Sequence, residues 1–156
     1  MIANIRIQAD GNSQSLCQLD LMKFGIEEIR QRMSERGIKE DSLFVCGFSD
    51  WQIDTIMSLE EAYLLRKVIL ELYDGDDFLI QHMLRHHQSP MFIMTHYFRF
   101  ISKDETKVMK HLLREADMDS VVDFFFQASS WVNALQTYID RGIVLNTNKG
   151  FYVQIV

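Results

Sequence analysis

Apolar residues alternate at the two ends of the chain and follow a helical spacing between them, and this order constrains the fold more than any other feature. Alternation over residues 2–9 and 16–21, joined by turn-forming residues at 10–13, indicates a β-hairpin. Helical spacing follows over 25–36, and a further strand is predicted over 43–48. The first fifty residues therefore predict a ββαβ unit.

Helix-start signals mark the middle of the chain. Ser58 and Glu61 match the S-x-x-E capping box, and apolar residues at helical spacing follow it as far as Leu72. Turn-forming residues end this helix, and a shorter one is predicted to run to about residue 86. The segment 91–101 is ambiguous between helix and strand.

The remaining third of the chain begins with a second capping-box match. Ser102 and Glu105 are predicted to open a helix that runs through about residue 115. Two more helices are expected over 119–126 and 131–140. Each of these segments is short, so the predicted helices need tertiary packing to be stable.

The chain is predicted to close with a hairpin whose strands cover 143–145 and 151–155. We therefore predict an α+β fold, an elongated chain of three small subdomains. These are an N-terminal mixed unit over 1–57, a helical middle over 58–101, and C-terminal helices with the hairpin over 102–156.

The composition is that of a globular intracellular protein. With 156 residues and 47% hydrophobic content, the chain can bury a core without disulfides or metal. Cys17 and Cys46 lack C-x-x-C spacing and are predicted to be free thiols in a reducing cytosol. Neither a signal peptide nor an apolar run long enough to span a bilayer is recognisable, so we expect a cytoplasmic location without membrane contact.

The net charge of −6 is unevenly distributed along the chain. Residues 1–78 hold 15 Asp and Glu against 8 Lys and Arg, whereas residues 79–156 hold 7 against 8. An acidic first half argues against direct nucleic-acid binding, which needs a basic face. It is compatible with a basic partner surface, although mild acidity can also serve only solubility.

Catalytic signatures are absent from the sequence, which has no P-loop, G-x-G-x-x-G, G-x-S-x-G or H-E-x-x-H motif. His82, His86 and His87 form a cluster in which His82 and His86, at i and i+4, are a possible two-ligand metal face of a metal-dependent enzyme. No Asp, Glu or Cys holds an obvious third position, although Asp76 or Asp77 could approach, and a solvated helix end explains the cluster better. Paired carboxylates at predicted helix starts are explained by capping. We therefore predict no catalytic residue, no cofactor and no metal.

The aromatic run at residues 124–126 is too apolar to face solvent on every side. Core packing is the simpler interpretation, and a protein–protein interface that also includes Trp131 is the alternative.

The C-terminal segment resembles a known family. Leu-Gln-Thr-Tyr-Ile-Asp at 135–140, a strand, the turn Thr-Asn-Lys-Gly at 147–150 and a final strand are similar to the end of the ArdA antirestriction proteins. The acidic, aromatic segment 119–126 and the helix start at Ser58 match that family more loosely. The chain departs from the family in its lower acidity and in the basic side chain of Arg141.

The resemblance implies an elongated homodimer that inhibits type I restriction–modification enzymes by DNA mimicry. In such proteins, exposed carboxylates occupy the basic channel that otherwise holds DNA. The expected partner is thus a DNA-binding defence enzyme. Its contacts are predicted to be Glu27, Glu28, Glu35, Glu40, Asp41, Asp50, Asp54, Glu60, Glu61, Asp74, Asp76, Asp77, Asp117, Asp119 and Asp123. The alternative is an ArdA-like scaffold that binds another protein through apolar contacts, without DNA mimicry.

Overall fold

The chain folds into two compact units, Met1–Thr95 and His96–Val156. The computed structural model describes residues 1–155, apart from the side chain of Trp131. Each unit combines helices with an antiparallel sheet, which confirms the predicted α+β class. The first two of the three predicted subdomains, 1–57 and 58–101, fall largely within the N-terminal unit.

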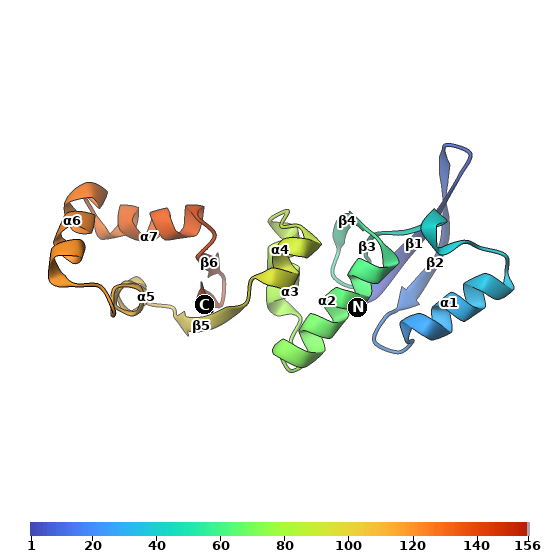
Figure 1. The fold of residues 1–156 in the computed structure, drawn as a ribbon, viewed down its shortest axis with the longest axis horizontal. Helices are drawn as coiled ribbons and strands as arrows, with labels where there is room; N and C mark the ends of the chain where they lie inside the picture. The colour runs from blue at the N-terminus through green and yellow to red at the C-terminus, as the bar shows by residue number, and fades with distance from the viewer. Residues whose placement is uncertain (156) are drawn as a thin grey trace. The chain divides into compact units, whose positions relative to one another are not determined.

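A four-stranded antiparallel sheet organises the N-terminal unit (Figure 1). Its strands are β1 (Ile2–Ala9), β2 (Asn12–Asp20), β3 (Leu43–Phe48) and β4 (Ile53–Met57), in the order β2-β1-β3-β4. The predicted hairpin of β1 and β2 is confirmed, with its turn at Asp10 and Gly11 in left-handed backbone conformations. Strand β4 was not predicted, so the unit is ββαββ rather than ββαβ before the next helix.

The connection between β2 and β3 contains one α-helix and one 3₁₀ turn. Helix α1 (Ile26–Glu35) buries Ile29 and Met33, the apolar positions one turn apart. The 3₁₀ turn η1 (Glu40–Ser42) then leads directly into β3. The predicted helix over 25–36 is therefore confirmed within one residue at each end.

Three helices complete the N-terminal unit: α2 (Leu59–Leu72), α3 (Phe78–Arg85) and α4 (Pro90–Thr95). The first predicted capping box is confirmed, because the Glu61 N–H donates to Ser58 Oγ at 3.0 Å and the Ser58 N–H donates to the Glu61 carboxylate at 2.8 Å.

Trp51, in the turn between β3 and β4, ties the helices to the sheet. Its indole Nε1 donates to Asp77 Oδ2 at 2.9 Å, and its carbonyl accepts from the Arg85 guanidinium at 2.8 Å. The buried ring packs against Phe48, with centroids 4.6 Å apart. These contacts explain why no boundary between compact units falls near residue 57.

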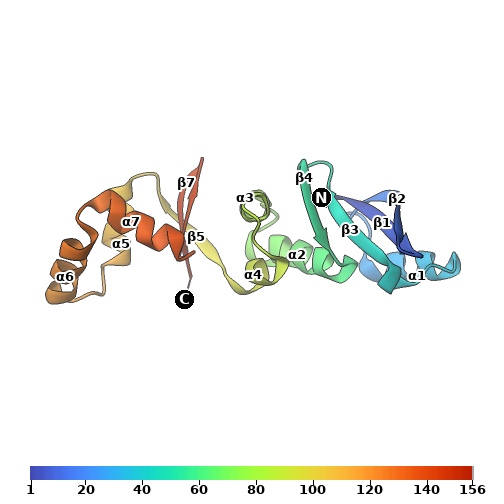
Figure 2. The same ribbon diagram turned by 90° about the horizontal axis from the view of Figure 1, so that it is seen from above.

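A three-stranded antiparallel sheet of order β5-β7-β6 and three helices form the C-terminal unit. In chain order, the elements are β5 (Phe98–Ser102), α5 (Glu105–Leu112), α6 (Met118–Ala128), α7 (Trp131–Asp140), β6 (Val144–Thr147) and β7 (Gly150–Gln154). The helices lie together on one side of the strands in both views (Figures 1 and 2). The predicted closing hairpin is confirmed as β6 and β7.

The second capping-box prediction is wrong. Ser102 is the last residue of β5, and the helix is capped instead by Asp104, whose carboxylate accepts from the Thr106 N–H at 2.8 Å. Because the cap lies two residues later, Glu105 is the first helical residue and cannot reach back as the box requires. The helix ends at Leu112, before the predicted residue 115.

The core of the C-terminal unit joins the helices to the hairpin. Its buried residues are Val108, Met109, Ala134, Leu135, Val144, Phe151 and Val153. Gly150 has a φ of 128°, and a Cβ there would lie 2.8 Å from the Phe100 ring and 2.9 Å from the Ser102 carbonyl. Only glycine therefore allows β5 to pair this closely with β7. Over residues 1–155, no helix is both long and apolar enough to cross a membrane.

Candidate functional site

The negative charge of the protein belongs to the N-terminal unit. Residues 1–95 contain fifteen Asp and Glu against nine Lys and Arg, a net charge of −6, whereas residues 96–156 contain seven of each. Twelve of the fifteen predicted contact carboxylates lie in the N-terminal unit, and Asp117, Asp119 and Asp123 lie in the C-terminal one. The excess of acidic side chains is therefore a property of the first unit.

Arg30 and Arg32 form ion pairs with some of the carboxylates of α1 and η1. The Arg30 guanidinium donates to both oxygens of Glu40, at 2.8 and 2.9 Å, and to Glu27 at 2.9 Å. Arg32 binds Glu28 at 2.7 Å, one helical turn away. The hydrogen bonds that Arg30 donates to Glu40 and, to a smaller extent, to Glu27 raise the pKa of Arg30. Glu27, Glu28 and Glu40 thus share two arginines, so the group of five side chains keeps one net negative charge.

Asp50 is also compensated. Its carboxylate lies 2.7 Å from the Met1 ammonium and accepts from the Ile2 N–H at 2.8 Å. Partial burial acts to raise the pKa of Asp50, but these two interactions outweigh it and hold the pKa below its usual value. This side chain fastens the start of β1 to the end of β3.

A second group of predicted contacts accepts hydrogen bonds that support the fold and forms no ion pair with a Lys or Arg of the described residues. Glu61 completes the capping box of α2, and Asp76 accepts from the Phe78 N–H at the start of α3. Asp77 accepts from the Trp51 indole, as described above. Asp117 caps α6, and hydrogen bonds from Ser120 lower its pKa. Glu35 accepts from the neutral amide of Gln31.

The remaining predicted contacts are exposed, and within residues 1–155 their side chains form no hydrogen bond or ion pair. They are Asp41, Asp54, Glu60, Asp74, Asp119 and Asp123. We call them the unpaired carboxylates. They are distributed over both units, in the 3₁₀ turn η1, strand β4, helices α2 and α6 and one loop, so the structure does not bring them to a single element.

The aromatic run of α6 is divided between core and solvent. Phe124 packs against the core of the C-terminal unit, with its ring centroid 5.6 Å from that of Tyr138. Phe125 and Phe126 are 42% and 79% exposed. Core packing thus accounts for Phe124, whereas Phe125 and Phe126 are exposed enough to belong to a protein–protein interface. The side chain of Trp131 lies outside the described residues.

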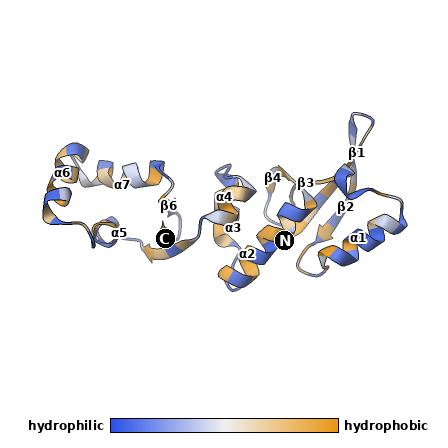
Figure 3. Cartoon of the chain, in the orientation of Figure 1, coloured by the Kyte–Doolittle hydropathy of each residue, from blue (hydrophilic) through white to orange (hydrophobic). Residues whose placement is uncertain are grey.

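Met118 and Val122 extend this exposed apolar surface. Their side chains are 74% and 43% exposed, and α6 contains no fully buried residue. Apolar and polar residues share the helix (Figure 3). We call Met118, Val122, Phe125 and Phe126 the α6 stripe. Scattered apolar residues on a surface are ordinary, but four large ones on one helix are typical of a contact surface.

The histidines of α3 form a ring pair without a third ligand. The rings of His82 and His86 have centroids 4.2 Å apart, and His86 Nδ1 lies 2.8 Å from the His82 carbonyl oxygen. Burial, then the neighbouring His86 and Arg85, lower the pKa of His82. His87 is exposed in a left-handed conformation beyond the helix. Among the described residues, no group of three His, Cys, Asp or Glu side chains is arranged to hold a metal ion.

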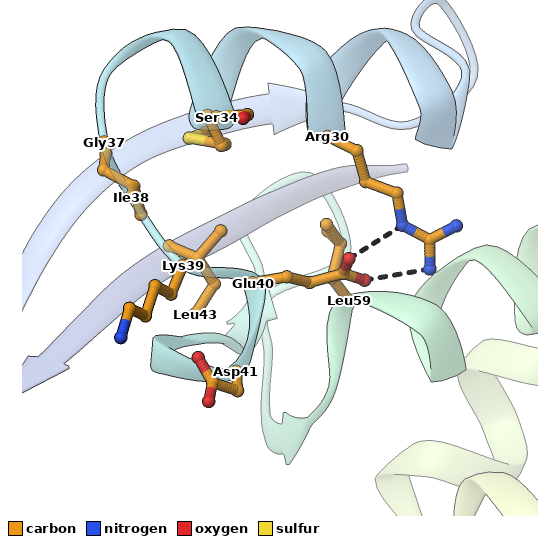
Figure 4. A pocket seen from close by; sticks show the side chains of 10 residues that line it. Arg30, Ser34, Gly37, Ile38, Lys39, Glu40, Asp41, Leu43 and Leu59 are labelled. Carbon is orange, nitrogen blue, oxygen red and sulfur yellow. Dashed lines mark hydrogen bonds and ion pairs between the residues drawn. The ribbon is translucent and has the colours of Figure 1, made fainter.

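One open cavity of about 610 Å³ lies where α1, η1, β3 and the start of α2 meet (Figure 4). Met33, Ile38, Leu43 and Leu59 contribute apolar walls, and the Arg30–Glu40 pair crosses it. Lys39 and Asp41 also line it, so both signs of charge are present. This mixture favours neither an anionic nor a cationic ligand.

Some of this pairing could be found in the sequence and some could not. Glu27–Arg30 and Glu28–Arg32 follow the i,i+3 and i,i+4 spacing of helical ion pairs. Glu40 reaches Arg30 only because the chain folds back after α1, which no local pattern indicates.

In comparisons with known proteins, no family model, no curated protein and no solved structure matches the chain.

Proposed function

We propose that the chain is an ArdA-like antirestriction protein that inhibits a type I restriction–modification enzyme through its acidic surface. The observation that supports this most is the concentration of the whole net charge of −6 in the N-terminal unit, where most of the acidic side chains are exposed. The choice of family rests on the resemblance of residues 135–150 to the C-terminal segment of ArdA proteins. The protein would act without catalysis or cofactor, as a cytoplasmic homodimer.

The proposed mechanism is electrostatic competition with DNA. A carboxylate can substitute for a backbone phosphate only where no internal cation already neutralises it, because the target must supply that cation. Glu27, Glu28, Glu40 and Asp50 already have cationic partners within the chain, although Glu27 and Glu40 share one. The proposal therefore relies on the unpaired carboxylates of the N-terminal unit, with the charged capping residues in support.

The test is inhibition of a type I enzyme together with binding to its methyltransferase core at several salt concentrations. The wild-type chain should inhibit, and its affinity should fall steeply with salt because exposed charges are screened over about 10 Å at 0.1 M. Asp41→Asn/Asp54→Asn should weaken binding. Glu105→Gln/Asp140→Asn makes the same charge change in the neutral unit and serves as the control. Absence of both inhibition and salt-sensitive binding would refute the proposal.

A second candidate function is an ArdA-like scaffold that binds another protein by apolar contacts. It is favoured by the α6 stripe, where Met118 and Phe126 are more than 70% exposed. Binding of this kind should depend little on salt and should show a large negative heat-capacity change. Calorimetry at two temperatures and two salt concentrations distinguishes it from the first candidate.

Light scattering tests the proposed homodimer, and a monomer at micromolar concentration would contradict it.

A further inference from the structure

We propose that the α6 stripe is the docking surface for a basic amphipathic helix of a partner protein. The proposal rests on the second candidate function and specifies the chemistry of the partner. It starts from the position of each α6 side chain around the helix axis, which advances by about 100° per residue.

The α6 stripe forms one continuous face. Met118, Val122, Phe125 and Phe126 fall at positions i, i+4, i+7 and i+8, within an arc of about 100°. The stripe extends along about 12 Å of the helix, since each residue rises about 1.5 Å. This length and spacing suit one face of a second helix, which presents side chains at the same intervals.

The stripe is distinct from the side of α6 that packs on the core. Phe124 and Ala128 contact the hydrophobic core of the C-terminal unit. Their positions lie about 100° or more from the centre of the stripe. The folded C-terminal unit therefore already uses the other side of α6, and the stripe remains exposed within the described residues.

Charge around the stripe identifies the class of partner. Asp119 and Asp123 are exposed and lie one helical turn apart. Around the helix axis they are adjacent to Phe126, on the side of α6 that faces away from the core. Helix α6 contains no Lys or Arg. A partner helix with Lys or Arg beside its apolar residues would pair with these aspartates. The α6 of a second copy would bring only further aspartates to the contact.

The experiment uses two synthetic helical peptides with the same leucine stripe, one flanked by lysines and the other by glutamates. Binding to the full chain is measured by fluorescence anisotropy at low and at 0.15 M salt. We expect the lysine peptide to bind at least tenfold more tightly than the glutamate peptide. Met118→Gln/Phe126→Gln should abolish binding, and Asp119→Asn/Asp123→Asn should weaken it several-fold. Glu105→Gln/Asp140→Asn makes an equal charge change elsewhere in the same unit and should leave binding unchanged.

The outcomes separate this proposal from the function on which it rests. Equal affinity for the two peptides would overturn the basic partner while supporting apolar binding by α6. Binding to neither peptide would overturn the proposal. So would the finding that the chain is a dimer and that Met118→Gln/Phe126→Gln makes it a monomer, because a second copy of the chain would then cover the stripe. Since both substituted side chains are exposed, an unchanged unfolding midpoint shows that each variant is folded.

Discussion

Residues of one chemical type have different roles in this chain because their neighbours differ. Asp50 holds two strands together, Asp117 caps a helix, and Asp41 has no interaction partner within the described residues. Sequence alone predicts all three as equivalent surface charges. The difference arises from tertiary neighbours, such as the Met1 ammonium beside Asp50, which lies 49 residues away in the chain.

The Asp50 ion pair predicts a pH-dependent stability difference. Because the folded pKa of Asp50 is depressed, its stabilisation is fully present above the unfolded carboxyl pKa of about 3.9 and is lost as the pH falls through the folded value. Asp50→Asn should therefore lower the urea midpoint at pH 7, and the gap from wild type should shrink below about pH 4. A gap of constant size from pH 7 to pH 2.5 would contradict this account of the ion pair.

Truncation of Phe124 should destabilise the protein far more than truncation of Phe126. Phe124→Ala removes a ring packed against Tyr138 and the core, so it should cost about 2–4 kcal/mol of unfolding free energy. Phe126→Ala removes a ring that is 79% exposed and should change the free energy by less than about 0.5 kcal/mol. Urea denaturation of the two variants checks the contrast, and similar costs at both positions would mean that Phe126 is buried in solution.

At the scale of elements, helix and strand periodicity was predictable wherever one face is buried. Helices α1, α2 and α7 and the two hairpins agree with their predicted ranges within a few residues. Strand β4 was missed because Ile56, in the alternating series of Ile53–Met57, is 78% exposed and disrupts the pattern. The run 91–101 was ambiguous because it contains nearly all of α4, a short connection and most of β5, each too short to show its own period.

The capping box of α2 provides an element-scale prediction. Ser58→Ala removes the acceptor of the Glu61 N–H and should destabilise the N-terminal unit by about 1 kcal/mol. Ser58→Asp retains an acceptor at the cap and should restore most of that loss. Thermal unfolding of the two variants measures the difference. If alanine and aspartate were equally destabilising, the hydrogen bond would not be the source of the effect.

At the scale of the whole molecule, the division into two units is the feature that sequence patterns could not give. Composition and spacing suggested three parts because α2–α4 form a helical stretch between two mixed ones. The contacts of Trp51 with Asp77 and Arg85 join residues 26 and 34 positions apart, and no periodicity encodes them. The acidic site was predictable as a count of charges with two helical ion pairs, whereas the pairs of Glu40 with Arg30 and of Asp50 with Met1 depend on the tertiary fold.

Trp51→Phe should affect the two units unequally. Phenylalanine keeps the ring contact with Phe48 but loses the hydrogen bond to Asp77, at a cost of about 1.5–3 kcal/mol. Amide hydrogen exchange should therefore become faster in β3, β4 and α3, while protection in β7 stays close to wild type. An equal loss of protection in both units would show that they open as a single cooperative body.

The strand order β5-β7-β6 has a consequence for synthesis on the ribosome. The middle strand of this sheet is β7, which follows every other element of its unit in the chain. During translation, β5 and β6 therefore leave the exit tunnel before β7, the strand that pairs with both of them. Helices α5 to α7 are also synthesised before this sheet can form. The N-terminal sheet, by contrast, is complete once Met57 has emerged. The nascent chain thus matures in two stages, and its later stage ends only when the hairpin closes at Gly150.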